Sequence, residues 1–205
     1  MTTNIVLAGV GGQGILSIAN VIGVAALKDN LYLKQAEVHG MSQRGGDVQS
    51  NLRISDKPIA SDLIPLGGAD LIVSLEPMEA LRYLPFLNSK GWLVTNTNPF
   101  INIDNYPPIK EILQELEQID NLVAFDMDKV AKEHGSPRSS NMVLLGAISP
   151  FLNIPIDLLE DGIKVFFASK GEKIVNLNVE CFHAGREDAI NFIKEGKKGL
   201  IAQIF

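Results

Sequence analysis

Residues 4–28 read NIVLAGVGGQGILSIANVIGVAALK: a short apolar run, a glycine-rich turn and a longer apolar segment. The run Asn4–Ala8 has the length of a buried strand, and Ile15–Lys28 is apolar on nearly every side at the length of a helix. The glycines between them, Gly9, Gly11 and Gly14, have the G-x-G-x-x-G spacing of a turn that joins a strand to a helix. This stretch predicts a strand, a tight turn and a buried helix.

The same alternation of strand and helix continues along the chain. It predicts an α/β, Rossmann-like fold, a mostly parallel sheet with helices on both faces. Residues 47–55 alternate imperfectly and look half exposed, which favours an antiparallel or edge strand. The other expected strands are Tyr32–Glu37, Ala69–Leu75, Gly91–Asn96 and Leu122–Asp126, and the expected helices among them are Glu76–Leu87 and Ile109–Ile119.

The C-terminal third is predicted to be helical. One part of it is ambiguous, because Val175, Leu177 and Val179 alternate as a strand would, although helix is favoured. The expected helices are Met127–His134, Asn141–Leu152, Ile156–Ala168 and Gly171–Glu195.

Composition limits the classes of protein. The 205 residues are 46% hydrophobic and 20% charged, and no linker divides them, so we expect one domain over residues 1–205. A formal net charge of -6 with scattered Lys and Arg argues against nucleic-acid binding. The longest apolar run, Ile15–Leu27, is too short and too interrupted for a membrane span. The single cysteine, Cys181, permits neither a disulfide framework nor a cysteine-rich metal site and indicates a soluble, cytoplasmic protein.

Two interpretations of the glycine turn are open. The N–H groups and the dipole of the helix start favour a phosphate, whereas the glycines alone are equally suited to close packing of helix on strand. A dinucleotide site also needs an acid at the end of the second strand, about 20 residues on, and Glu37 lies near that place. A self-contained NAD(P)-dependent dehydrogenase or a nucleotide-binding module is therefore an alternative function.

The segment 37–46, EVHGMSQRGG, is too polar for a core and is expected at the same sheet edge as the glycine turn. It combines Glu37, His39 and Arg44 with three glycines, a composition suited to contact with a ligand or partner. Arg44 is suited to pair with a phosphate or carboxylate, or with a structural acid instead. His39 is suited to contact with a ligand, or instead to a purely structural place in a loop or an interface.

Two asparagines are further candidates. Asn96 comes at the carboxyl end of a strand, where open α/β sheets bind ligands, although turn formation before Pro99 explains it equally well. Asn141 follows two serines and is expected as the N-cap or a first-turn residue of a helix.

Three motifs together resemble a known family. GVGGQG at 9–14, EVHGMSQRGG at 37–46 and NMVLLGA at 141–147, in this order over essentially the whole chain, resemble the gamma-type domain of the 2-oxoacid:ferredoxin oxidoreductases, with the indolepyruvate type nearest. This family converts a 2-oxoacid, coenzyme A and oxidised ferredoxin into an acyl-CoA, carbon dioxide and reduced ferredoxin. The resemblance implies a single gamma-type domain over residues 1–205.

The family uses thiamine diphosphate with magnesium and [4Fe–4S] clusters. One cysteine cannot hold a cluster, and no Gly-Asp-Gly diphosphate motif occurs, because Gly46-Asp47 is followed by Val48. The resemblance therefore implies that a large alpha subunit carries these cofactors and reaches ferredoxin, while this chain is a small subunit with no metal site or catalytic residue of its own.

The resemblance also implies roles for particular residues. Coenzyme A would enter as a substrate, with its anionic groups at the glycine turn. The anion cradle would be Gly11, Gly12, Gln13 and Gly14; the residues facing a shared cleft would be Glu37, His39, Gln43, Arg44, Gly45 and Gly46, with Asn96 and Asn141 as additional candidates.

Overall fold

The computed structural model describes residues 1–39 and 45–195. Within them, β1 (Thr2–Val10), the glycine turn (residues 9–14) and α1 (Ile15–Lys28) confirm the predicted strand, turn and helix. Successive side chains of β1 alternate between two cores: Ile5 and Leu7 belong to one, Val6 and Ala8 to the other. β1 is therefore buried on both faces, which explains its uninterrupted apolar sequence.

The described strands form one sheet of six, in the order β2-β3-β1-β4-β5-β6. β1, β4, β5 and β6 are parallel neighbours, whereas β3 is antiparallel to both β1 and β2. The antiparallel direction predicted for residues 47–55 is confirmed, but this strand lies inside the sheet, and the edges are β2 and β6. The bounds are β2 (Tyr32–His39), β3 (Asp47–Ser55), β4 (Ala69–Ser74), β5 (Leu87–Asn96) and β6 (Leu122–Phe125).

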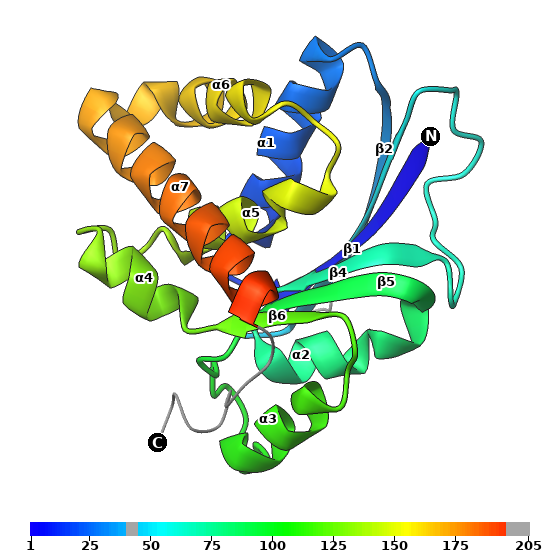
Figure 1. The fold of residues 1–205 in the computed structure, drawn as a ribbon, viewed down its shortest axis with the longest axis vertical. Coiled ribbons are helices and arrows are strands. Elements are labelled where there is room, and N and C mark those ends of the chain that lie inside the picture. Colours follow the sequence, from blue (N-terminus) through cyan, green and yellow to red (C-terminus); the bar gives the residue numbers. More distant parts are fainter. Residues whose placement is uncertain (40–44, 196–205) are drawn as a thin grey trace.

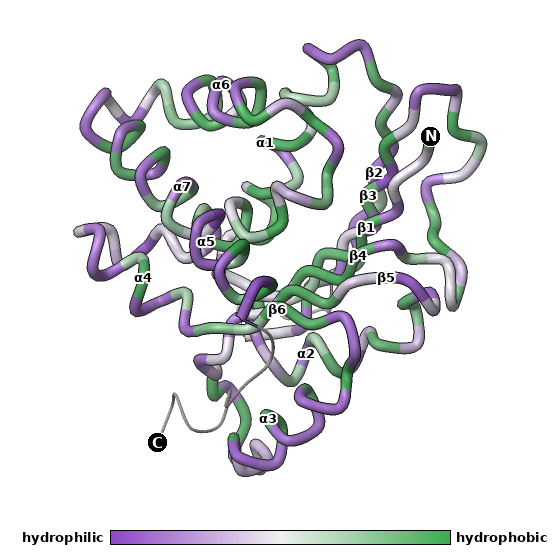
Figure 2. The backbone as a smooth tube through the Cα atoms, viewed as in Figure 1, coloured by the Kyte–Doolittle hydropathy of each residue, from purple (hydrophilic) through white to green (hydrophobic). Residues whose placement is uncertain are grey.

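Helices cover both faces of the sheet, as Figure 1 shows. The helices α2 (Pro77–Arg82) and α3 (Ile109–Glu117) pack on one face. The other face carries α1 and the helical C-terminal part of the chain. The side chains between these helices and the sheet form the larger of the two cores. The strands between these layers are hydrophobic along much of their length (Figure 2). The C-terminal helices are α4 (Met127–Glu133), α5 (Ser140–Ile148), α6 (Ile156–Phe167) and α7 (Glu172–Glu195).

Two expectations about helices have clear outcomes. The single helix predicted for residues 76–87 is wrong: α2 ends at Arg82, and a 3₁₀ turn, Leu84–Phe86, follows. Pro85 lies in that turn and has no N–H group to continue an α-helix. The ambiguous segment 174–182 is helical, as favoured, because it lies within α7. No helix in the described ranges is long and apolar enough to cross a membrane.

Candidate functional site at the carboxyl edge of the sheet

The predicted site residues that the structure describes gather at one edge of the sheet. The strands β1, β2, β4, β5 and β6 end there, and the antiparallel β3 begins there. Gly11 donates its N–H to the carbonyl of Gly46 at 2.8 Å. The glycine turn and the segment before β3 therefore lie side by side, as the sequence predicts.

The glycine turn leaves donors available at the start of α1. Gly12 and Gly14 have φ values of 105° and 83°, a conformation that favours glycine. Their N–H groups meet no acceptor among the described residues. No side chain caps α1, and its first turn contains no acid. This helix start is therefore electropositive and accessible in the way an anion requires.

Gln13 has a structural role in this turn. Its side-chain oxygen accepts the N–H of Val10 at 2.7 Å, and its amide donates to the carbonyl of Leu75 at 3.1 Å. Gln13 thus bridges the ends of β1 and β4. The chain leaves β1 toward β2 on one side of the sheet, and β4 lies on the other side of β1. The gap between the ends of β1 and β4 is therefore the switch point where open α/β sheets bind ligands. The Gln13 side chain occupies it.

Asn141 lies beside the same turn, although 127 residues separate it from Gly14. It is in the first turn of α5, as predicted, and is only 7% exposed. Its amide donates to the carbonyl of Gly14 at 3.3 Å, and a Cβ on Gly14 would lie 2.7 Å from that amide nitrogen. Its buried oxygen meets no donor in the described chain. A water or a bound molecule is needed to satisfy this oxygen.

Glu37 is exposed on β2 and accepts a hydrogen bond from the Gln35 amide at 2.7 Å. β3 separates β2 from β1, so Glu37 is two strand spacings, about 10 Å, from the strand that carries the glycine turn. In dinucleotide-binding folds the ribose-binding acid ends the strand next to that turn. The inserted β3 thus moves Glu37 away from the position that the dinucleotide interpretation requires.

Three predicted site residues of the 37–46 segment are described only in part or not at all. Gln43 and Arg44 lie outside the described residues, and His39 is placed only as the end of β2. Gly45 and Gly46 are described, and both exchange backbone hydrogen bonds with Gly11. The ligand roles of His39, Gln43 and Arg44 stay predictions.

Asn96 is buried and fully engaged at the end of β5. Its oxygen accepts the N–H groups of Met127 and Asn98, and its amide donates to Asp128 at 2.8 Å. The Asp128 carboxylate also accepts the Asn98 amide at 2.9 Å and the hydroxyl of Ser140. This network joins β5, α4 and α5, and it uses the groups with which Asn96 would bind a ligand.

Sequence reasoning missed Asp128 and a second carboxylate, Glu76, which lies two residues after the end of β4. Glu76 is fully buried, caps α2 by accepting the N–H of Glu79 at 2.8 Å, and accepts the hydroxyl of Tyr106. Burial, together with this bond to Glu76, raises the pKa of Tyr106 far above its usual range, so the hydroxyl stays a donor. The available signal was the position of each acid, in or next to the first turn of a helix after a strand.

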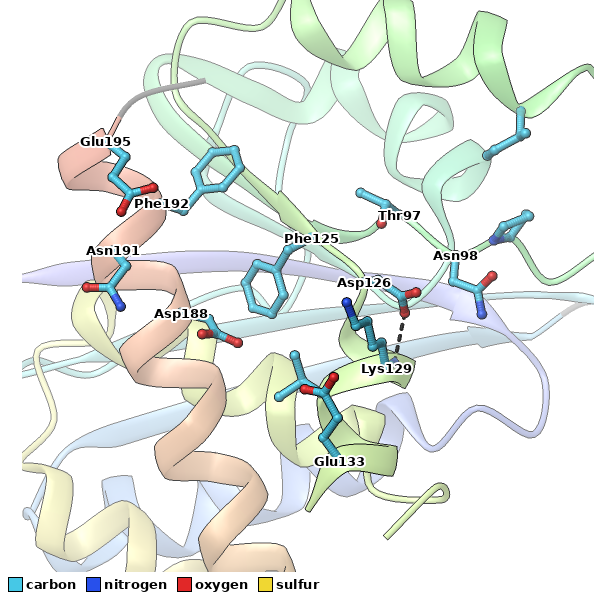
Figure 3. Close-up of a pocket in the computed structure, with 13 residues that line it drawn as sticks. Thr97, Asn98, Phe125, Asp126, Lys129, Glu133, Asp188, Asn191, Phe192 and Glu195 are labelled. Atoms are coloured by element: carbon cyan, nitrogen blue, oxygen red, sulfur yellow. Dashed lines mark hydrogen bonds between the residues drawn. The ribbon is translucent and has the colours of Figure 1, made fainter. Parts of the chain in front are cut away.

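An acidic cleft of about 790 Å³ lies farther along the same edge, between α4, α7 and the end of β6 (Figure 3). Phe125 and Phe192 line it together with four acids, Asp126, Glu133, Asp188 and Glu195, and one cation, Lys129. Burial, followed by the charges of Glu187 and Glu133, raises the pKa of Asp188. The negative charges of this cleft disfavour binding of an anion, whereas the glycine turn favours it.

Comparison with known proteins agrees with this architecture. Residues 4–188 match the family model described as pyruvate ferredoxin/flavodoxin oxidoreductase. The chain is 37% identical over 200 residues to indolepyruvate oxidoreductase subunit IorB of Archaeoglobus fulgidus, covering 93% of this chain and 97% of that protein. It is 40% identical to the subunit of the same name from Pyrococcus horikoshii, with 89% and 93% covered.

Solved structures share the fold. A 2-oxoglutarate:ferredoxin oxidoreductase from Magnetococcus marinus, with 2-oxoglutarate, coenzyme A and succinyl-CoA bound, matches with a TM-score of 0.73 and 25% identity. The match covers 93% of this chain but only 31% of that one, so this chain spans about a third of its length. The gamma subunit of a keto/oxoacid ferredoxin oxidoreductase from Geobacter sulfurreducens matches with a TM-score of 0.67 at 24% identity, over 92% and 99% of the two chains. The chain belongs to the pyruvate ferredoxin/flavodoxin oxidoreductase family.

Proposed function

We propose that this chain is the small subunit of an indolepyruvate-type 2-oxoacid:ferredoxin oxidoreductase and is active only with a larger partner subunit. The observation that carries the proposal is the match, over nearly the full length of both proteins, to subunits named indolepyruvate oxidoreductase subunit IorB. A second observation supports it: about the same length of chain is part of a polypeptide some three times as long in the Magnetococcus marinus enzyme.

The redox cofactors belong to the partner in this proposal. A [4Fe–4S] cluster takes four cysteine ligands, and this chain has one cysteine, which is buried. When bound to the partner, thiamine diphosphate would supply the decarboxylation of the 2-oxoacid. Overall, the 2-oxoacid and coenzyme A yield acyl-CoA, carbon dioxide and a proton, and two electrons pass through the clusters to ferredoxin.

Coenzyme A is the ligand that this chain would help to bind. The N–H groups of Gly12 and Gly14 at the start of α1, for which the described residues offer no acceptor, suit its phosphates, whereas the acidic cleft does not. Coenzyme A also carries amide N–H and hydroxyl donors, the type of group that the Asn141 oxygen does not meet within the described chain. Gln13 would act by holding the turn in shape.

The dinucleotide alternative has less support. Gln13 fills the gap between β1 and β4, and β3 separates Glu37 from the turn. A thermal shift assay distinguishes the two ligands, since a ligand at 100 times its Kd stabilises the native state by about 2.7 kcal/mol. Stabilisation by NADH but not by coenzyme A would favour the dehydrogenase.

Reconstitution tests the function. We expect no oxidation of indolepyruvate by this chain alone, and CoA-dependent reduction of ferredoxin when it is co-expressed with the thiamine- and cluster-binding subunit from the same genome. Oxidoreductase activity of the isolated chain, or its failure to associate with that subunit, would refute the proposal.

A pair of glycine variants tests the anion cradle in the complex. Gly12 and Gly171 both have positive φ, and a Cβ on either would meet no atom within 4 Å. Alanine at either position therefore adds similar backbone strain, but only at residue 12 does the methyl group stand at the proposed ligand. We expect Gly12→Ala to raise the KM for coenzyme A about tenfold or more and Gly171→Ala to leave it unchanged. Equal KM values for coenzyme A in the two variants would contradict binding of coenzyme A at the glycine turn.

A further inference from the structure

The loop between β5 and α3, residues 97–108, exposes large apolar side chains. Phe100 is 45% exposed, Ile101 69% and Ile103 41%. We call these three residues the apolar ridge. Most connections in compact domains have about 4–6 residues, so this loop is long, and long loops often carry function.

The loop is held at several points, so the ridge is presented on a fixed support. The Asn98 amide donates to Asp128 at 2.9 Å, and the Asn102 amide donates to the carbonyl of Gly45. Near its end, the Tyr106 hydroxyl donates to the buried carboxylate of Glu76. These bonds use the polar side chains of the loop and leave the apolar ones facing water.

The ridge is continuous with the candidate site. Asn102, which separates Ile101 from Ile103 in the sequence, contacts Gly45, and Gly45 is hydrogen-bonded to Gly11 of the glycine turn. Any chain that closes over the glycine turn therefore meets the ridge at its border. Contiguous exposed apolar groups beside a polar site are typical of protein interfaces.

We propose that the apolar ridge is the surface through which this chain docks onto its larger partner subunit, with the ridge seated in an apolar hollow of that subunit. This inference rests on the proposed function. It is supported by the Magnetococcus marinus enzyme, in which a region of this fold is one third of a longer polypeptide and so is kept next to the rest of the enzyme. Because the ridge carries no charge, its contact with the partner depends little on salt.

Serine substitutions test the ridge against a matched surface. The ridge variant is Phe100→Ser with Ile101→Ser. The control is Leu63→Ser with Leu66→Ser, because these leucines are 58% and 69% exposed on the loop between β3 and β4, which meets the opposite edge of the sheet. We expect the ridge variant to bind the co-expressed large subunit at least about tenfold more weakly, the cost of losing one strong apolar contact, and the control to bind as the wild type does.

Activity separates docking from catalysis. With excess ridge variant, kcat for indolepyruvate should return toward the wild-type value, since the variant retains the glycine turn. Wild-type binding by the ridge variant would overturn this inference but not the proposed function, whereas failure of the wild-type chain to bind the large subunit would overturn the proposed function. A dimer of the isolated chain that the ridge variant abolishes would assign the ridge to self-association and also overturn the inference.

A cross-linking experiment keeps the proposal testable if the serine variant does not fold. The native Cys181 is buried, so a new cysteine at Ile101→Cys carries the only accessible thiol of the described chain. A short thiol-reactive photo-cross-linker at residue 101 should join this chain to the large subunit, and the same reagent on Leu66→Cys should not. Equal cross-linking from both positions, or none from residue 101, would contradict docking by the ridge.

Discussion

Gln13 shows how one side chain shapes the site through hydrogen bonds to the backbone. Its two hydrogen bonds satisfy the N–H of buried Val10 and the carbonyl of buried Leu75. We expect Gln13→Ala to lower the free energy of unfolding by about 1–3 kcal/mol, because the Val10 N–H loses its bond to the Gln13 side chain and the Leu75 carbonyl keeps only a longer bond, 3.5 Å, from the Asn96 amide. Urea denaturation measures this loss. Asn20→Ala, which removes an exposed side-chain bond to the Leu16 carbonyl, should cost no more than about 0.5 kcal/mol. Equal losses would contradict the bridging role of Gln13.

Cys181 provides a second prediction at the scale of a residue. Burial, with a smaller contribution from the charge of Glu180, raises the pKa of its thiol to about 11. In the unfolded chain the thiol ionises first, so between about pH 9 and 11 the native state holds the proton more often, and stability falls as the pH rises. We expect urea midpoints to drop more steeply over this range in the wild type than in Cys181→Ala. Parallel pH profiles would show that the thiol does not titrate in this way.

The residues of the site could be predicted only where local sequence decides their role. The glycine turn, the position of Asn141 in the first turn of its helix and the contact of residues 45–46 with the turn are predictable from the order of motifs. The role of Gln13 depends on Leu75, which is distant in the sequence. The hydrogen bond from Asn96 to Asp128 likewise depends on a contact between the end of β5 and the first turn of α4, which no single segment encodes.

At the scale of elements, periodicity predicts most helices and strands but not how the strands are ordered. The 3.6-residue pattern finds α3 and α6 because each has one apolar face. The imperfect alternation in the sequence of β3 indicates an unusual strand but does not reveal its neighbours, since an edge strand and an antiparallel inner strand alternate alike. The position of β3 matters for the predicted site, because an inner β3 separates Glu37 from the glycine turn.

The close crossing of α5 and α7 allows a prediction about the stability of glycine variants. The two backbones touch at glycines: a Cβ on Gly146 would overlap the carbonyl of Phe182, and one on Gly185 would overlap the carbonyl of Val143. Either alanine variant must push two buried helices apart, so we expect a loss of about 3 kcal/mol or more in the free energy of unfolding. The measurement is chemical denaturation of the purified variants.

A helical glycine with free space is the matched control. On α1, a Cβ at Gly23 would meet only the Leu33 side chain, at 3.9 Å. Gly23→Ala should therefore stabilise the chain by about 0.5–1 kcal/mol through helix propensity alone. Similar stability of Gly146→Ala and Gly23→Ala would mean that α5 and α7 are not in backbone contact.

At the scale of the whole molecule, the two ends of the sheet differ in character. The carboxyl edge gathers the glycine turn, the Asp128 network, the apolar ridge and the acidic cleft. The opposite edge holds Met1, whose amino group pairs with Asp56 just after β3. The contacts that we propose with other molecules are thus concentrated on one edge, and the amino terminus is on the other (Figure 1).

This polarity predicts the behaviour of a fused enzyme. In the Magnetococcus marinus structure, the matching region is part of a longer chain. Joining the large subunit to Met1 of this chain through a Gly/Ser linker of about 30 residues, with a typical span of about 30 Å, should leave the carboxyl edge free to dock. Covalent linkage raises the effective concentration of the partner, so the CoA-dependent activity per molecule should stay constant on dilution, whereas that of the separate subunits should fall. Enzyme assays over a dilution series measure both. A fusion that is inactive although the separate subunits are active would mean that the edge carrying Met1 also takes part in the complex.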